Sequence, residues 1–387
     1  MTQHEPIVIS SYARTPIGSF LGRLSGVKAT ALGAAAVQET VRRAGVDPEK
    51  IDRVVMGCVL AAGLGQAPAR QAALGAGLPL KVEATTVNKM CGSGLQSVIL
   101  AADTIMAGSA DIIVAGGMES MSNAPYLLLK HRGGARIGHD RMTDSMFLDG
   151  LEDAYEPGKL MGAFAEDSAR TYQLTREAQD AFALESLSRA RAAQASGAFD
   201  REIIAVSGVT QDEQPGRGDP ARIPTLKPAF SAGGTITAAN ASSISDGAAA
   251  MLVCSAATAV ALGLPIAARI IAHAAHAQEP ALFTTAPVPA IRKVLVKAGW
   301  SVADVDLFEI NEAFAAVAMI AMRELAIPHE RLNVNGGACA LGHPIGASGA
   351  RILATLLAAL EARGKKRGIA ALCIGGGEAV AIAVERG

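Results

Sequence analysis

Cys91 is the first residue whose type and surroundings could do covalent chemistry. It stands in VNKMCGSGLQSVILAA, between a short β-like stretch that ends at Val87 and an Ala/Leu-rich helical stretch. The thiol is therefore predicted at or near a helix N-terminus, where unpaired N–H groups and about half a positive charge favour a thiolate. The flanking glycines allow a sharp turn that exposes the sulfur. The alternative is a buried, inert thiol, the usual fate of a free cysteine.

Three more residues have chemistry that complements a reactive thiol. His343 lies in the glycine-rich segment NVNGGACALGHPIGASGARI, which argues against a ring that fills a core. Cys373 ends the apolar stretch IAALCIGGG, where a core cysteine and a reactive thiol both fit. Asn311 follows the strand-like LFEI and either caps the next helix or holds a water. An imidazole would help form a thiolate, and a second acid/base would move a proton beside a thioester carbonyl.

A weak internal repeat relates these residues in space. The segments AGVDPEKIDRVVMG (44–57) and AGWSVADVDLFEIN (298–311) resemble each other, as do the stretches that begin at Gly94 and Gly349. Each copy indicates a helix end, a short turn and a strand, then a Ser-Gly turn, an apolar helix and a buried strand. The repeat predicts that the cysteine turn and the histidine turn are near-symmetry mates at one edge of a sheet. Chance likeness of generic strand–helix units is the alternative.

The region between the copies has a different composition, with polar loops and one amphipathic helical run over Thr175–Gln194. We interpret it as an insertion that covers the duplicated core. The predicted fold class is α/β, in layers, with glycine turns at strand ends where small-molecule sites tend to lie. The predicted divisions are an N-terminal half (1–120), the insertion (121–238), the completion of the N-terminal half (239–267) and a C-terminal half (268–387).

Bulk composition excludes several classes of protein. The 387 residues are enough for two or three domains, and a net charge of −1 predicts no general affinity for nucleic acid or membrane. The sequence has neither signal-peptide character nor an uncharged apolar run long enough to span a bilayer. Five widely spaced cysteines argue against a disulfide framework or a metal site. We expect a cytoplasmic protein with no bound metal.

The motifs NKMCGSG, GGMESMS, NEAF, GHPIGASGAR and CIGGG follow one another along essentially the whole chain and resemble the signature set of the thiolase family. The resemblance implies a duplicated α/β/α/β/α fold with an inserted loop domain for CoA binding and tetramer contact. It implies reversible condensation of acetyl-CoA with an acyl-CoA, or thiolysis of a 3-ketoacyl-CoA as in β-oxidation of fatty acids. The expected partners are acyl-CoA and CoA as substrates, without another cofactor. The expected assembly is a homotetramer, a dimer of dimers.

The resemblance also implies a role for each residue. Cys91 would carry the acyl group, His343 would take its proton, and Cys373 would remove or return the α-proton. Asn311 would hold a water that, with the histidine, forms one oxyanion hole, and the N–H groups of Cys91 and Gly375 would form the other. The residues expected to contact CoA or its acyl chain are Ser242, Arg217, Arg222, Met161, Ala313 and Phe314.

Three departures from the family pattern leave questions open. Leu160 and Phe283 stand where acetoacetyl-CoA-forming members carry His and Met near the acyl chain, so the preferred chain length stays open. The sequence does not give the direction of reaction either, because metabolite levels set the flux. Glu378 stands where a methionine is common, and the sequence offers no physical reason for that change.

Two alternative functions predict a different set of catalytic residues. A related condensing enzyme would pair one cysteine with two histidines or with His and Asn, and a non-catalytic acyl-CoA or sterol carrier would lack a catalytic residue. A redox dithiol protein needs a Cys-x-x-Cys pair, which is absent.

Overall fold

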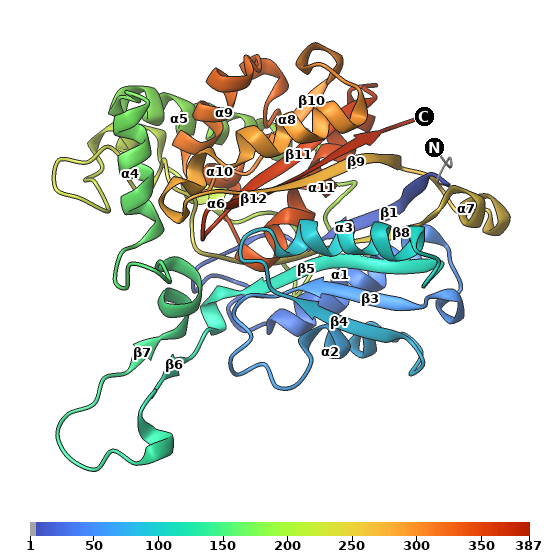
Figure 1. Cartoon of the computed structure of the whole chain (residues 1–387), viewed down its shortest axis with the longest axis horizontal. Coiled ribbons are helices and arrows are strands. Elements are labelled where there is room, and N and C mark those ends of the chain that lie inside the picture. Colours follow the sequence, from blue (N-terminus) through green and yellow to red (C-terminus); the bar gives the residue numbers. More distant parts are fainter. Residues whose placement is uncertain (1–4) are drawn as a thin grey trace.

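The computed structural model describes residues 5–387 and divides into two halves of similar architecture. Figure 1 shows the N-terminal half in blue to cyan, the C-terminal half in orange to red, and the intervening segments along one side. The pairing of β1 with β9 joins the halves into one ten-stranded sheet, in which β2 (Gly18–Ser19) pairs with β8 off the main path. That junction is only three residue pairs long, so each half keeps its own sheet.

The two sheets have the same strand pattern. In each, a parallel pair is followed by two strands that alternate in direction, and β4 extends the N-terminal sheet. The N-terminal order is β4 (Glu83–Val87), β3 (Arg53–Gly57), β5 (Ile112–Ser120), β8 (Ser245–Ser255) and β1 (Ile7–Arg14), and the C-terminal order is β10 (Leu307–Ile310), β11 (Arg367–Ile374), β12 (Glu378–Glu385) and β9 (Ala268–Ala277).

Helices form three further layers around and between the sheets. One pair packs on the outer face of the N-terminal sheet, one on the outer face of the C-terminal sheet, and one lies between the sheets. These pairs are α1 (Ala29–Ala44) with α2 (Pro68–Gly75), α8 (Pro287–Ala298) with α9 (Ala315–Leu325), and α3 (Ser93–Met106) with α11 (Ile345–Ala362). The predicted α/β/α/β/α fold is confirmed. By length and composition α11 could cross a membrane, but 89% of that stretch is buried inside the protein.

The predicted repeat corresponds to equivalent elements. α1 and α8 both end at a glycine in the left-handed conformation, Gly45 at φ 67° and Gly299 at φ 68°, which only glycine adopts freely. A short 3-10 helix and a strand follow in each copy, β3 in one and β10 in the other. The two segments matched in the sequence therefore occupy the same place in the two halves.

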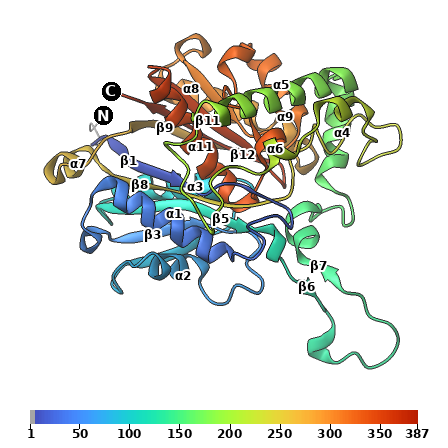
Figure 2. The same ribbon diagram turned by 180° about the vertical axis from the view of Figure 1, so that it is seen from behind.

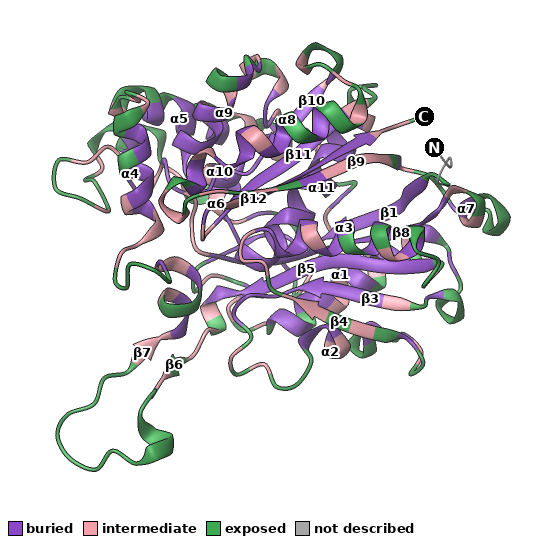
Figure 3. Cartoon of the chain, viewed as in Figure 1, coloured by how far each residue is buried: buried purple, intermediate pink, exposed green. Residues whose placement is uncertain are grey.

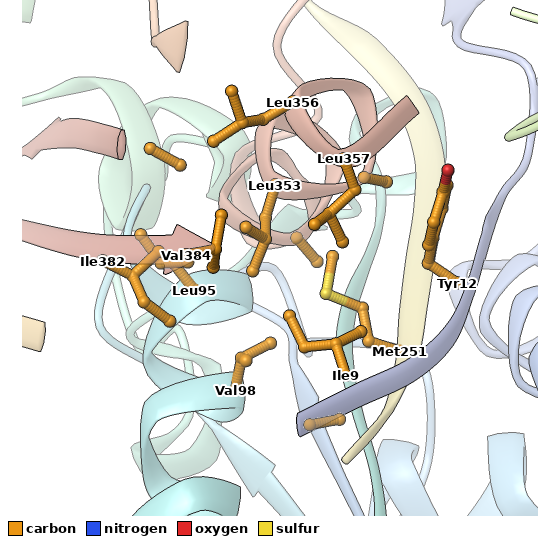
Figure 4. Close-up of a cluster of buried hydrophobic side chains, with 14 of the residues drawn as sticks. Ile9, Tyr12, Leu95, Val98, Met251, Leu353, Leu356, Leu357, Ile382 and Val384 are labelled. Atoms are coloured by element: carbon orange, nitrogen blue, oxygen red, sulfur yellow. The ribbon is translucent and has the colours of Figure 1, made fainter. Parts of the chain in front are cut away.

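The central layer holds the largest apolar cluster. Figure 4 shows Leu95 and Val98 of α3, with Leu353 and Leu357 of α11, packed between side chains of both sheets. Full burial of one such side chain contributes roughly 1.5–3 kcal/mol relative to exposure. The largest apolar cluster therefore surrounds the contact between α3 and α11.

Two glycines let these central helices cross with their backbones in contact. A Cβ on Gly94 would lie 2.8 Å from the backbone N of Ala350, and a Cβ on Gly349 would clash with the backbone N of Leu95. The crossing is in the first turn of each helix, immediately after the cysteine turn and the histidine turn. The close approach therefore brings the two predicted reactive turns together.

The segment between the halves covers one side of the core. Its longest helix, α5 (Arg176–Ala195), begins where Thr175 Oγ accepts a hydrogen bond from the N–H of Ala178, which agrees with the predicted helical run. Figure 2 shows α5 and α6 over the C-terminal half, while Figure 3 shows the β6–β7 loop as an exposed projection. The remaining elements are β6 (Tyr126–Leu127), β7 (Thr143–Asp144), a π-helix (Phe147–Leu151), α4 (Met161–Thr171), α6 (Gln214–Arg217), α7 (Ala256–Leu262) and α10 (Ala338–Leu341).

We predict that Gly349→Ala destabilises the protein, although alanine is the better helix former. The new methyl group would meet the backbone of α3, and overpacking typically costs about 1–3 kcal/mol. Urea unfolding should show a lower midpoint for this variant. Gly26→Ala is the control, because a Cβ there meets nothing within 4 Å. An unchanged or higher midpoint for Gly349→Ala would contradict the close crossing.

Candidate active site

A cavity of about 500 Å³ opens where the two halves meet the inserted segment. Its lining comes from the turn before α3, the turn before α11, the end of β11 and loops of the insertion. The lining includes nine of the sequence-predicted residues: Cys91, His343, Cys373, Gly375, Ser242, Arg217, Met161, Ala313 and Phe314. The structure therefore gathers most of the predicted set around one space.

The turn that carries Cys91 is held in a strained conformation. Met90 has φ 45°, a region that non-glycine residues rarely enter, and such strain persists only where surrounding contacts enforce it. Here the Ser93 hydroxyl accepts from the N–H of Lys89 at 2.8 Å and donates to the carbonyl of Met90 at 2.6 Å. Cβ of any other residue at Gly92 would clash with Ile374 of β11. The lack of a side chain at Gly92 therefore lets the cysteine turn pack closely against β11 of the C-terminal half.

Burial keeps the Cys91 sulfur protonated in the free protein. It raises the pKa of the thiol to about 11, although hydrogen bonds from the N–H of Gly375 and its own N–H act to lower that pKa; the Glu119 carboxylate raises it further. α3 does begin two residues later, at Ser93, as predicted. The local N–H groups favour the thiolate as predicted, but desolvation outweighs them, so the thiol needs a base to lose its proton.

His343 is fixed as a neutral base. Its Nδ1 lies 2.5 Å from the Ser348 hydroxyl, which itself donates to the carbonyl of Pro344 at 2.9 Å. The hydroxyl therefore accepts from Nδ1–H, so Nε2 carries the free lone pair. Burial, followed by the positive charge of Arg351, lowers the pKa of the imidazole to about 3. The ring is therefore neutral and its Nε2 lone pair is available, although the lowered pKa makes it a weak base until charge develops in the reaction.

Asn311 is oriented toward the histidine. Its Nδ2 lies 3.5 Å from His343 Nε2, and its Oδ1 accepts from Arg351 at 3.4 Å. Arg351 is also paired with Glu309 at 3.7 Å, and both side chains are buried. Helix capping is excluded for Asn311, because the residue that precedes α9 is Phe314. Asn311 is not among the residues that line the cavity, but its side-chain amide lies directly beside the His343 ring.

Cys373 is buried beside Cys91. It stands near the end of β11, before a hairpin in which Gly376 and Gly377 have φ near 90°. Burial, and then the charge of a Cys91 thiolate, raise the pKa of its thiol well above the usual range. The sulfur is part of an apolar cluster and also lines the cavity. Core packing and a place in the cavity lining are thus combined in one residue, and the predicted reactivity of its thiol stays a prediction.

Of the residues predicted to contact CoA, all but Arg222 line the cavity. Ser242 donates its N–H to the carbonyl of Ala313 at 3.0 Å, which joins two lining segments. Phe314 packs edge-on against Phe230, with ring centres 5.9 Å apart. Arg217 is exposed and lines the cavity, whereas Arg222 is exposed on a 3-10 turn outside the lining. The structure does not bring Arg222 to the cavity.

Much of the cavity lining is apolar. The large apolar residues in the lining include Phe147, Leu151, Leu160, Ile345 and Phe283, and Phe283 packs edge-on against Phe314. A lining of this kind suits the hydrocarbon part of a ligand.

Sequence reasoning missed three buried residues that hold the site together. Glu119 accepts from the N–H groups of Val59, Leu60 and Gly346, and burial raises the pKa of its carboxyl to about 7. Ser348 and Arg351 orient the histidine and the asparagine. All three stand inside the motifs GGMES and GHPIGASGAR, so their membership in those motifs was the available signal.

Comparisons with known proteins agree with this geometry. The family model "Thiolase, N-terminal domain" matches residues 7–257, and "Thiolase, C-terminal domain" matches residues 264–386. The chain belongs to the thiolase family. These models do not test the finer domain boundaries, which stay predictions.

Relatives of this thiolase are similar over nearly their whole length. Acetyl-CoA acetyltransferase 2 of Arabidopsis thaliana is 51% identical, over 98% of this chain and 96% of that protein. Acetyl-CoA acetyltransferase of Cupriavidus necator is 50% identical, over 98% and 99%. The crystal structure of the Bacillus anthracis acetyl-CoA acetyltransferase superposes with a TM-score of 0.95 at 40% identity, over 99% of both chains.

We predict that alkylation of Cys91 by iodoacetamide in the substrate-free enzyme keeps accelerating from pH 7 to pH 10. Only the thiolate reacts, and a pKa raised to about 11 leaves the thiolate fraction small throughout that range. Peptide mass spectrometry would follow the modification, with Cys91→Ser as the background for the other thiols. A rate that levels off below pH 8 would contradict the assigned protonation state.

Proposed function

We propose that this thiolase transfers acyl groups between CoA thioesters by forming an acyl–Cys91 intermediate. The observation that supports it most directly is the shared cavity, in which a thiol, a neutral imidazole and a second thiol arrive from the two halves of the fold. Nucleophilic catalysis needs a thiol next to a base, and carbon–carbon bond formation needs a further acid/base. The cavity supplies one nucleophilic thiol, Cys91, one base, His343, and one further acid/base, Cys373.

The first half-reaction loads the enzyme. His343 Nε2 takes the Cys91 proton as the sulfur attacks the thioester carbonyl, and the carbonyl oxygen becomes negatively charged. The N–H groups of Cys91 and Gly375 act on the Cys91 sulfur in the free protein, and we propose that they donate to the oxyanion that forms beside it. The C–S bond to CoA then breaks, CoA leaves with the proton that His343 returns, and the acyl group stays on Cys91.

The second half-reaction makes the carbon–carbon bond. His343 Nε2 takes the proton of the Cys373 thiol, and the resulting Cys373 thiolate removes a proton from the methyl carbon of acetyl-CoA. The enolate oxygen then receives hydrogen bonds from the Nε2–H of His343 and from a water held by Asn311. The enolate carbon attacks the acyl–Cys91 carbonyl, and the sulfur leaves as a thiolate that recovers its proton from His343. Thiolysis is the same sequence in reverse, with Cys373 returning the proton to carbon.

We propose acetyl-CoA and acetoacetyl-CoA as substrates, because the relatives are named acetyl-CoA acetyltransferases. Longer 3-ketoacyl-CoA of fatty acid β-oxidation is the second candidate, favoured by the apolar side chains in the cavity lining, which include Leu160 and Phe283. CoA is bound as substrate and product, and residues 5–387 contain no group of His, Cys, Asp or Glu side chains arranged to hold a metal.

We propose a homotetramer located in the cytoplasm. The projecting loop between β6 and β7 exposes large apolar side chains, including Leu129 and Ile137, in the segment predicted to make the tetramer contact. Exposed apolar groups of this kind mark interaction surfaces. Five free thiols suit a reducing compartment.

We predict that the two cysteines fail at different steps when mutated. Cys91→Ser should abolish acetylation by acetyl-CoA and lower turnover by at least about 10³-fold, since the thiolate is lost. Cys373→Ser should still acquire acetyl on Cys91 but condense and thiolyse poorly. Mass spectrometry and steady-state kinetics measure the two properties. Normal turnover of Cys91→Ser, or equal loss of both steps in Cys373→Ser, would refute the assignment.

We predict that replacing residues 132–138, which are part of the projecting loop between β6 and β7, by a short Gly-Ser linker yields a smaller assembly. Acetylation of Cys91 should be retained, because this loop lies outside the cavity. Light scattering coupled to size-exclusion chromatography measures the mass. A tetramer of unchanged mass would refute the proposed contact.

A further inference from the structure

Two segments that carry opposite walls of the oxyanion hole are joined by one ion pair. Lys89 Nζ lies 2.7 Å from Glu378 Oε2, with the two side chains 24% and 36% exposed. Lys89 is two residues before the nucleophile, and Glu378 begins β12 directly after the glycine hairpin. The pair therefore spans from the cysteine turn to the turn that presents the N–H of Gly375.

Both connected segments need an external restraint. The hairpin consists of three successive glycines, Gly375–Gly377, which have the widest conformational freedom of any residue. The cysteine turn is held in a strained conformation at Met90. Their relative position decides how well the N–H of Gly375 faces the Cys91 sulfur, and losing one oxyanion donor typically costs about 10²–10³ in rate.

We infer that Lys89 and Glu378 are positioning residues, which hold the cysteine turn against the glycine hairpin so that the oxyanion hole is formed before substrate binds. The inference rests on the proposed function. It also supplies a physical account of Glu378, which the sequence left unexplained. Partly exposed ion pairs add little to global stability, so the contribution is expected in the acylation rate rather than in unfolding.

The test compares Lys89→Gln, Glu378→Gln and the exchange Lys89→Glu/Glu378→Lys by rapid-mixing acetylation of Cys91 with acetyl-CoA. Each single variant should slow acetylation about two- to fivefold, the range that partly exposed pairs can supply, with the KM for acyl-CoA nearly unchanged. The exchange should recover at least half of the wild-type rate. Glu49→Gln, which breaks the exposed Lys81–Glu49 pair at the other end of β4, is the matched control and should leave the rate unchanged.

Acetylation and iodoacetamide alkylation, measured on the same variants, together separate positioning from a direct effect of charge on the thiol, because only the acetylation rates differ between the two explanations. A direct effect makes the two single variants change in opposite directions, because one leaves a positive and the other a negative charge near Cys91. Positioning predicts opposite directions for alkylation but slowing by both variants for acetylation. Opposite directions in acetylation, unchanged rates, or no recovery in the exchange would each overturn the inference.

The same measurements distinguish failure of the ion-pair inference from failure of the proposed function. If wild-type Cys91 acquires acetyl and the variants acetylate at the wild-type rate, the ion-pair inference alone is overturned. If wild-type Cys91 acquires no acetyl, the proposed function is refuted, and the ion-pair inference is refuted with it.

Discussion

The backbone contact between α3 and α11 is the constraint on which the rest of the structure depends. Gly94 and Gly349 are equivalent in the two copies of the repeat, and each leaves room for the backbone of the other helix. Since the reactive turns immediately precede these helices, the crossing brings a thiol from one half to an imidazole from the other. Without the duplication, the two groups would lie at the ends of separate sheets.

Burial gives this site its electrostatic character. Both reacting groups are neutral at rest: transfer of a proton from a thiol of pKa about 11 to an imidazole of pKa about 3 is uphill on the order of 10 kcal/mol before their mutual attraction is counted. The thiolate therefore forms as the attack proceeds, when the developing oxyanion takes up the charge. Rigid donors such as the N–H of Gly375 then matter more than a preformed thiolate.

The sequence predicted the layers, the repeat and nine residues around the cavity, because motifs and helical periodicity are local signals. It could not predict the protonation state of Cys91, since desolvation depends on side chains from distant segments that cover the sulfur. The partner of Glu378 was hidden for the same reason, as Lys89 is 289 positions away in the chain. The sequence could not tell which of Arg217 and Arg222 lines the cavity, because charge and loop composition do not specify which arginine faces it.

The most direct test of the division of labour between the thiols is exchange of the methyl protons of acetyl-CoA with deuterated water, followed by proton NMR. In a Cys91→Ala enzyme, which cannot carry an acyl group, we expect exchange to persist because Cys373 still removes the α-proton. Adding Cys373→Ala to that enzyme should abolish the exchange. Exchange that continues without the Cys373 sulfur would contradict the account.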